Sequence, residues 1–236
     1  MKKGGRWSPF FFPATGGPWF LVIREQPRLP RIADAAAFAD ALAMTGETGT
    51  SIVSLIQYDA MRIAISGAHG TGKTTLIDAL AEALPDYEAV EEPYHLLVGE
   101  GHEFLEEPTV EDFELQLRRS VECLQDDRSN VIFDRCPADF LAYLTAGAGQ
   151  ALDLGDLPEV TAALATLDLI VLVPIETPDR ISIPSDEYPR LRRHVDRRLQ
   201  DLLLDDELEL STPVLVASGN VQQRVDAVLR ALTSRT

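Results

Sequence analysis

Apolar and polar positions alternate in two regular ways along the chain from Met61 onwards. Five short apolar runs predict buried strands, at 61–66, 87–90, 130–134, 167–174 and 213–218. Between and after these runs, apolar residues recur at the spacing of an amphipathic helix. The predicted helices lie at 74–84, 109–124, 137–146, 187–204 and 221–232. Strands that alternate with helices predict an α/β fold, a three-layer α/β/α sandwich around a mostly parallel five-stranded sheet.

The first 60 residues follow a different pattern. Three prolines and a Gly-Gly pair interrupt an aromatic and apolar stretch, WSPFFFPATGGPWFLVI, and they disfavour both a helix and a central strand. The same interruptions count against a secretory signal. One amphipathic helix is predicted at 32–46. We expect residues 1–60 to form a poorly structured extension, either dispensable or upstream of a true start at Met61, and residues 61–236 to form one domain.

Charge and composition exclude several classes of partner. The formal net charge is −17, and the acidic excess lies after residue 60, so the chain is a poor binder of nucleic acid. No run approaches the roughly 18 apolar residues of a membrane span. The two cysteines, Cys123 and Cys136, form no disulfide framework, which fits a reducing, cytoplasmic setting. We therefore expect neither nucleic acid nor membrane as a partner, and the oligomeric state is left open.

The stretch GAHGTGKTT carries the most specific motif in the chain. It matches the phosphate-loop pattern G-x-x-x-x-G-K-[ST], with a predicted strand before it and a predicted helix after it. Glycines let backbone N–H groups turn towards a phosphate, and the helix directs its positive end to the same place. We expect Lys73 to reach the β- and γ-phosphates and the Thr74 hydroxyl to bind Mg²⁺. The expected nucleotide-binding residues are Gly67, Ala68, His69, Gly70, Thr71, Gly72, Lys73, Thr74 and Thr75.

Three well-known classes of phosphate-loop protein are excluded by absent motifs. Lys73 is the only lysine after Lys3, so the guanine-binding N-K-x-D motif of Ras-like GTPases cannot occur downstream of the loop. The L-S-G-G-Q signature of transporter-type ATPases is also absent. Motor-type ATPases usually follow the third strand with Asp-Glu, whereas this strand ends in Phe133-Asp134-Arg135.

Charged residues at the ends of two predicted strands fit phosphoryl transfer, which needs positioning and charge neutralisation. We expect Asp134 to hold Mg²⁺, directly or through water, and Arg135 to pair with oxygens of the acceptor or its phosphate. Glu92 is expected to accept or orient the proton of the acceptor hydroxyl. Glu91 competes for this role, because side-chain alternation places only one of the two in the cleft. A solvated strand end is the alternative for both glutamates.

Two of these motifs resemble kinase signatures. VIFDRCPADFLAY resembles the Asp-Arg signature of nucleoside and nucleotide kinases, and Glu92-Pro93 resembles the Glu-Pro step of deoxynucleoside and thymidylate kinases. With the phosphate loop, they make residues 61–233 similar to the small AAA-type ATPase and kinase group, which includes the nicotinamide riboside kinase-like domains. The resemblance implies the P-loop kinase type of sandwich, with ATP and Mg²⁺ as cofactors.

The resemblance also implies a lid at about 177–204, whose arginines close on the triphosphate. Arg190 and Arg193 are the expected lid arginines, and a salt-bridged surface helix is the alternative. In this fold the loop after the last strand lies against adenine, so Gly219 and Asn220 are expected nucleotide contacts, although Asn220 suits a helix N-cap equally well. Asp139 is expected either to orient Arg135 or to compensate the helix N-terminus.

The sequence therefore predicts an ATP- and Mg²⁺-dependent phosphotransferase that acts on a small hydroxyl-bearing metabolite, such as a nucleoside or nucleotide. The alternative is an ATP- or GTP-binding switch that hydrolyses slowly and signals to a protein partner. Asp-Arg in place of Asp-Glu favours the kinase. Selectivity for the acceptor is expected from residues 93–127, which carry no recognisable motif.

Overall fold

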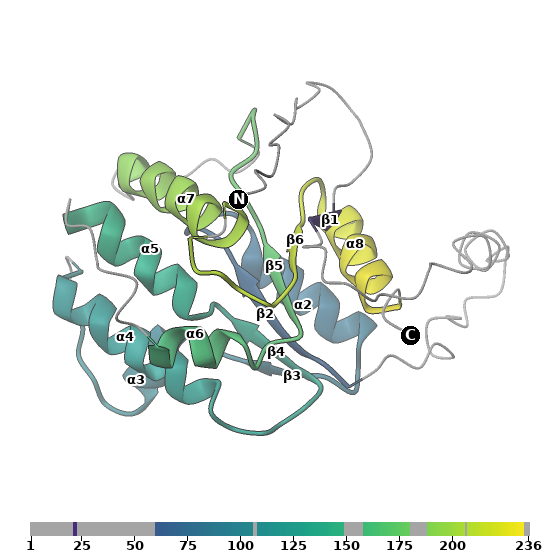
Figure 1. The fold of residues 1–236 in the computed structure, drawn as a ribbon, viewed down its shortest axis with the longest axis horizontal. Coiled ribbons are helices and arrows are strands. Elements are labelled where there is room, and N and C mark those ends of the chain that lie inside the picture. The colour runs from purple at the N-terminus through teal and green to yellow at the C-terminus, as the bar shows by residue number, and fades with distance from the viewer. Residues whose placement is uncertain are drawn as a thin grey trace, which may run out of the picture.

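The computed structural model describes residues 21–22, 60–105, 108–148, 158–179, 188–205 and 207–233. The strands in this part of the chain form one sheet, in the order β1-β6-β5-β2-β4-β3 (Figure 1). They are β1 (Leu21–Val22), β2 (Arg62–Ser66), β3 (Glu88–Val90), β4 (Val131–Asp134), β5 (Leu169–Leu172) and β6 (Val214–Val216).

The five strands predicted after Met61 are confirmed, and all of them are parallel. β1 adds a two-residue antiparallel strand beside β6, which the sequence pattern did not predict. It is an edge strand, a position that prolines nearby in the sequence do not forbid. The other residues before position 60, including the helix predicted at 32–46, lie outside the described residues.

Helices cover both faces of this sheet. They are α2 (Lys73–Ala83), α3 (Pro93–Gly99), α4 (Val110–Cys123), α5 (Pro137–Ala148), α6 (Pro158–Leu164), α7 (Pro189–Leu204) and α8 (Val221–Thr233). The predicted start of α4 is confirmed by a capping box, in which Thr109 and Asp112 satisfy each other's backbone N–H. The sequence analysis missed α3 and α6, because two helical turns are too short to show a periodic pattern.

Side-chain alternation in the central strands divides the core into two layers. Ile63 and Ile65 of β2 are buried against α2 and α8, whereas Ala64 faces the layer formed by α4, α5, α6 and α7. β5 divides in the same way, with Val171 on the α2 side and Ile170 on the other. Figure 1 shows α2 and α8 on one side of the sheet and α4 to α7 on the other. The predicted three-layer sandwich is confirmed.

The strand order places a topological switch point at β2. β4 and β3 lie on one side of β2, and β5 and β6 lie on the other. In open α/β sheets, ligands bind at such a point, beyond the carboxyl ends of the strands. β2 ends at Ser66, directly before the phosphate loop. The fold therefore brings the predicted motifs to the carboxyl ends of the parallel strands, where ligands bind in this type of sheet.

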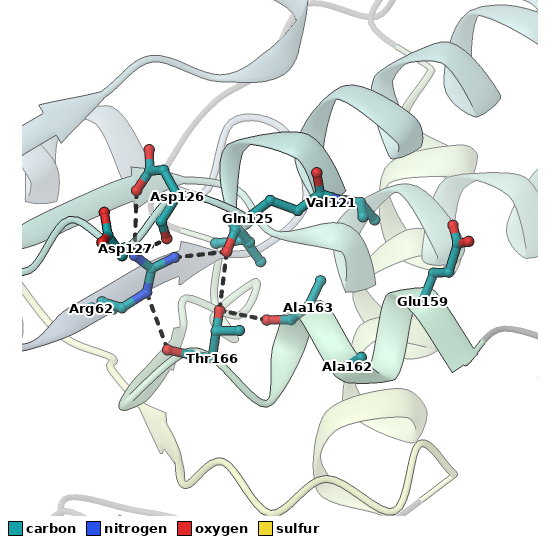
Figure 2. A pocket seen from close by; sticks show the side chains of 10 residues that line it. Arg62, Val121, Gln125, Asp126, Asp127, Glu159, Ala162, Ala163 and Thr166 are labelled. Carbon is teal, nitrogen blue, oxygen red and sulfur yellow. Dashed lines mark hydrogen bonds and ion pairs between the residues drawn. The ribbon is translucent and has the colours of Figure 1, made fainter.

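A pocket of about 580 Å³ lies at the amino ends of the strands, opposite the phosphate loop (Figure 2). Its residues have a structural role. Arg62, the first residue of β2, donates hydrogen bonds there to the carbonyl oxygens of Leu124, Asp126 and Thr166. These carbonyls belong to the connections that lead into β4 and β5. Arg62 therefore ties together the amino ends of three strands, away from the phosphate loop.

No helix within the described ranges is long and apolar enough to cross a membrane. Cys123 and Cys136 are both free thiols, and Cys136 is buried.

Candidate functional site

The phosphate loop makes a close turn between β2 and α2. Gly67 has a φ of 152°, and a Cβ at this position would collide with the carbonyl oxygen of Val173, so no other residue fits. Gly72 has a φ of 88° and is the N-cap of α2, which begins at Lys73. The positive end of the α2 dipole therefore points into the loop, as a phosphate site requires.

Lys73 is buried under the loop, with 6% of its surface exposed. Its Nζ donates to the carbonyl oxygen of Ala68 at 3.0 Å, and the Thr71 hydroxyl donates to the same oxygen, also at 3.0 Å. Burial lowers the pKa of Lys73 to about 8, and repulsion from Arg135 adds to this effect. Lys73 is thus an unusually desolvated cation in the free protein, and a bound phosphate would stabilise it.

Asp134 ends β4 beside Lys73, and its environment fits a metal ligand. Burial raises the pKa of Asp134 to about 6, although the charge of Lys73 opposes the increase. Within the described part of the chain, the buried Oδ1 atom has no hydrogen-bond partner. A carboxylate oxygen left without a partner suits a hard cation such as Mg²⁺. Thr74, the residue after Lys73, is exposed, and the binding of Mg²⁺ by its hydroxyl stays a prediction.

Arg135 and Glu92 form an ion pair at the adjacent strand ends. Arg135 Nε donates to Glu92 Oε2 at 2.7 Å, and Nη1 donates to the carbonyl oxygen of Gly67 at 3.2 Å. Burial alone would raise the pKa of Glu92, but the charge and hydrogen bond of Arg135 outweigh it and lower the pKa. Glu91 is exposed. Of the two competing glutamates, Glu92 is the one that lies beside the phosphate loop.

Asp139 joins the phosphate loop to the start of α5. Its carboxylate is fully buried and accepts hydrogen bonds from the backbone N–H of Gly67 and of Cys136, each at 3.0 Å. It also lies 3.4 Å from Arg135 Nη1. The two roles expected for Asp139, orienting Arg135 and compensating the N-terminus of α5, therefore coexist in one side chain.

The arginines in the first turns of α7 divide into two groups in the structure. Arg190 and Arg193 on α7 are exposed, and neither makes a hydrogen bond or ion pair within the described ranges. Arg192 between them is 3% exposed and donates to the carbonyl oxygens of His69 at 2.9 Å and Gly70 at 3.0 Å. The closing of Arg190 and Arg193 on a triphosphate stays a prediction, as does the lid at 177–204.

The sequence analysis missed Arg192, although a signal was present. Arg192 precedes Val195 by three residues and Leu199 by seven, so it belongs to the apolar stripe of α7. An arginine on the buried face of a helix needs partners there, because a buried charge must be paired.

The loop after β6 is linked to the phosphate loop through Arg224 of α8, which the sequence analysis also missed. Arg224 Nη1 donates to the carbonyl oxygen of Thr71 at 2.8 Å, and Nη2 lies 3.2 Å from Glu176. The backbone N–H of Gly219 donates to the same Glu176 carboxylate. Asn220 acts as the N-cap of α8, because its Oδ1 accepts from the Gln223 N–H at 2.9 Å. Contact of Gly219 and Asn220 with adenine stays a prediction.

These features define a class. A parallel sheet with a phosphate loop at its switch point, followed by an Asp-Arg pair on the neighbouring strand, is a P-loop kinase-like fold. Within this class, the model of an AAA domain family matches residues 62–224, and the chain belongs to that family.

Solved structures with the same fold include several kinases. Deoxyadenosine kinase from M. mycoides with bound dATP has a TM-score of 0.51 at 18% identity, over 73% of this chain and 99% of the kinase. NadR in complex with NR has a TM-score of 0.51 at 17% identity, over 73% of this chain and 51% of NadR. Thymidylate kinase from Candida albicans has a TM-score of 0.51 at 14% identity, over 76% and 93%. Identities this low support the fold only. A comparison with curated proteins found no match in sequence.

Proposed function

We propose that this protein is an ATP- and Mg²⁺-dependent phosphotransferase whose acceptor is a small hydroxyl-bearing metabolite, such as a nucleoside or nucleotide. The observation that carries the proposal is the Arg135–Glu92 pair, 2.7 Å apart, beside a complete phosphate loop. The loop alone would serve any nucleotide-binding protein. A buried cation and a carboxylate next to it provide what an acceptor needs, a partner for oxygens and a partner for a hydroxyl proton.

Each residue has a part in the reaction. The acceptor hydroxyl oxygen attacks the γ-phosphorus, and the bond from that phosphorus to the bridging oxygen of ADP breaks. Lys73 and the loop N–H groups hold the β- and γ-phosphates. Glu92 is ionised at neutral pH because Arg135 lowers its pKa, so it orients the hydroxyl and receives its proton as the bond forms. Mg²⁺, when bound, neutralises charge on the phosphates, and Thr74 and Asp134 are the residues that would hold it.

Kinases of the same fold make nucleosides and nucleotides the first acceptors to test. The experiment is a panel of nucleosides, deoxynucleosides, their monophosphates and simple ribosides, each supplied with ATP and Mg²⁺. We expect one acceptor class to raise ADP formation steeply, with a phosphorylated product identified by mass spectrometry. Glu92→Gln should lower kcat by about 100-fold or more, because it removes the proton acceptor.

Glu91→Gln is the matched control, because Glu91 is the exposed neighbour of Glu92. It should turn over close to the wild-type rate. Slow ATP or GTP hydrolysis that no acceptor stimulates, combined with equal activity of the two glutamine variants, would sink the kinase proposal. That result would favour the nucleotide-dependent switch with a protein partner.

We place the reaction in the cytoplasm. Two free cysteines suit a reducing compartment. The formal net charge of −17 disfavours nucleic acid as a substrate, since a phosphate backbone needs a basic surface to hold it. A nucleotide and a small-molecule acceptor are therefore the proposed ligands.

A further inference from the structure

Two buried arginines donate hydrogen bonds to backbone carbonyls of the phosphate loop. Arg192 comes from α7 and donates to the carbonyl oxygens of His69 and Gly70. Arg224 comes from α8 and donates to the carbonyl oxygen of Thr71. Three consecutive carbonyls of the loop are therefore held by two guanidinium groups, from helices that lie in different layers of the sandwich.

The direction of these carbonyls fixes the direction of the neighbouring N–H groups. A trans peptide is planar, and its C=O and N–H point to opposite sides. Because the carbonyls of His69, Gly70 and Thr71 face the two arginines, the N–H groups of residues 70, 71 and 72 point to the opposite side of the loop, away from the guanidinium groups. Inward N–H groups are the part of a phosphate loop that binds the anion.

We propose that Arg192 and Arg224 are positioning residues that hold the phosphate loop in its anion-binding conformation before nucleotide arrives. This proposal rests on the proposed nucleotide site, but it adds two residues outside the motif. Preorganised dipoles bind an anion without the cost of reorienting at the moment of binding. The effect should appear in phosphate affinity and in the protection of the loop backbone.

Carboxylates hold both arginines in place. Arg192 pairs with Asp179, and Arg224 pairs with Glu176. Both acids lie in the segment that follows β5. Each guanidinium therefore bridges that segment and the phosphate loop, using one edge for a carboxylate and another for loop carbonyls. A planar group with several donors can do this at fixed angles, whereas an ammonium group cannot.

The test compares Arg192→Gln and Arg224→Gln with Arg198→Gln, in the full-length protein. Arg198 is the matched control, because it is also an α7 arginine paired with a carboxylate, Glu207, but it makes no contact with the loop. Two quantities are measured: affinity for ATP and for inorganic pyrophosphate by calorimetry, and hydrogen–deuterium exchange of the amides of residues 70–72 without nucleotide.

We expect both loop variants to bind ATP and pyrophosphate about tenfold to hundredfold more weakly than wild type, as the loss of hydrogen bonds from a charged donor predicts. Amide exchange at 70–72 should be faster in both, and unchanged in β2. Arg198→Gln should match wild type in both measurements. Unchanged affinity and unchanged loop exchange in Arg192→Gln and Arg224→Gln would overturn the proposal.

A lysine variant keeps the test decisive if a glutamine variant does not fold. Arg192→Lys preserves the charge but cannot span two carbonyls and Asp179, so weak affinity and fast exchange should persist in this folded variant. Full recovery by lysine would contradict the positioning role. If wild type itself binds neither ATP nor pyrophosphate, the proposed function fails, and amide exchange still decides whether the arginines hold the loop.

Discussion

Lys73 should destabilise the free protein, so that its removal yields a more stable but inactive variant. The side chain is a buried cation whose pKa falls from its ordinary 10.5 to about 8, chiefly because burial disfavours the charge. In the free protein no phosphate offsets that cost. Lys73→Met keeps the length and the apolar part of the side chain and removes the charge.

Two contributions set the size of the effect. At ~1.4 kcal/mol per pH unit, the lowered pKa means that charged Lys73 costs the fold about 3 kcal/mol. Its 3.0 Å hydrogen bond to the Ala68 carbonyl offsets about 1 kcal/mol of this. The carbonyl keeps its bond from Thr71 Oγ1 after the substitution, so it is not left unpaired. We therefore expect Lys73→Met to raise the free energy of unfolding by about 2 kcal/mol near neutral pH.

The extra free energy of unfolding of Lys73→Met should decrease as pH rises. Because the pKa of Lys73 is lower in the folded chain, the unfolded chain binds more protons between about pH 8 and pH 10.5. Stability of the wild type attributable to Lys73 therefore rises with pH through that window. The penalty is complete below about pH 8 and disappears as pH approaches 10.5. The advantage of the methionine variant should shrink accordingly.

Urea unfolding of both proteins, followed by circular dichroism at several pH values, measures this difference. Titrating groups that Lys73 does not influence cancel between the two proteins, and the carboxylates whose pKa it lowers, Asp134 and Glu92, are ionised in the window between about pH 8 and pH 10.5. Calorimetry with ATP should show no binding to Lys73→Met. A variant that is less stable than wild type near neutral pH, or a stability gap that does not change up to pH 10.5, would refute the reasoning about burial.

Two further predictions concern carboxylates of the site. Since burial raises the pKa of Asp134 to about 6, Mg²⁺-dependent ATP binding should weaken as pH falls below 6, and Asp134→Asn should remove both the pH dependence and the response to Mg²⁺ in calorimetric titrations. A Mg²⁺ response that survives in this variant would exclude Asp134 as the ligand. Asp139→Ala should lower the free energy of unfolding by about 3 kcal/mol in urea titrations, because two buried N–H groups and Arg135 lose their acceptor. Asp139→Asn should cost less, and equal stability of Asp139→Ala and wild type would contradict the assigned contacts.

The residues that the sequence predicted well are those whose backbone geometry dictates the residue type. Gly67 is such a position, because a Cβ would collide with Val173 and its φ of 152° suits glycine alone. The strands after Met61 were equally accessible, because parallel central strands are continuously apolar. At these positions the local backbone conformation and the packing of the whole fold require the same type of residue. A single sequence is therefore enough to recognise them.

Residues that act across long sequence distances were harder to predict. Arg192 contacts His69, which lies 123 positions earlier, and no local pattern records that distance. The choice between Glu91 and Glu92 was also open, since it depends on where α3 begins and on which residue Arg135 reaches. The sequence does contain a signal that Arg192 is buried, because it lies on the apolar face of a predicted helix. A buried arginine needs a partner, but the sequence pattern does not identify which residue that partner is.

The charged groups of the site are paired with one another, and these pairings decide what each ligand has to displace. Lys73 is bonded to Ala68, and Arg135 is bonded to Glu92. A triphosphate can replace the hydrogen bond between Lys73 and the Ala68 carbonyl with a stronger, charge-assisted one. The free energy gained from the phosphate therefore exceeds the cost of breaking the existing bond. The acceptor must compete with Glu92 for Arg135, and a neutral hydroxyl competes poorly with a carboxylate. An acceptor that also carries an anionic group, such as a monophosphate, would release Glu92 for its hydroxyl. If the proposed function holds, this pairing predicts that a monophosphate acceptor is turned over more efficiently than the corresponding uncharged nucleoside.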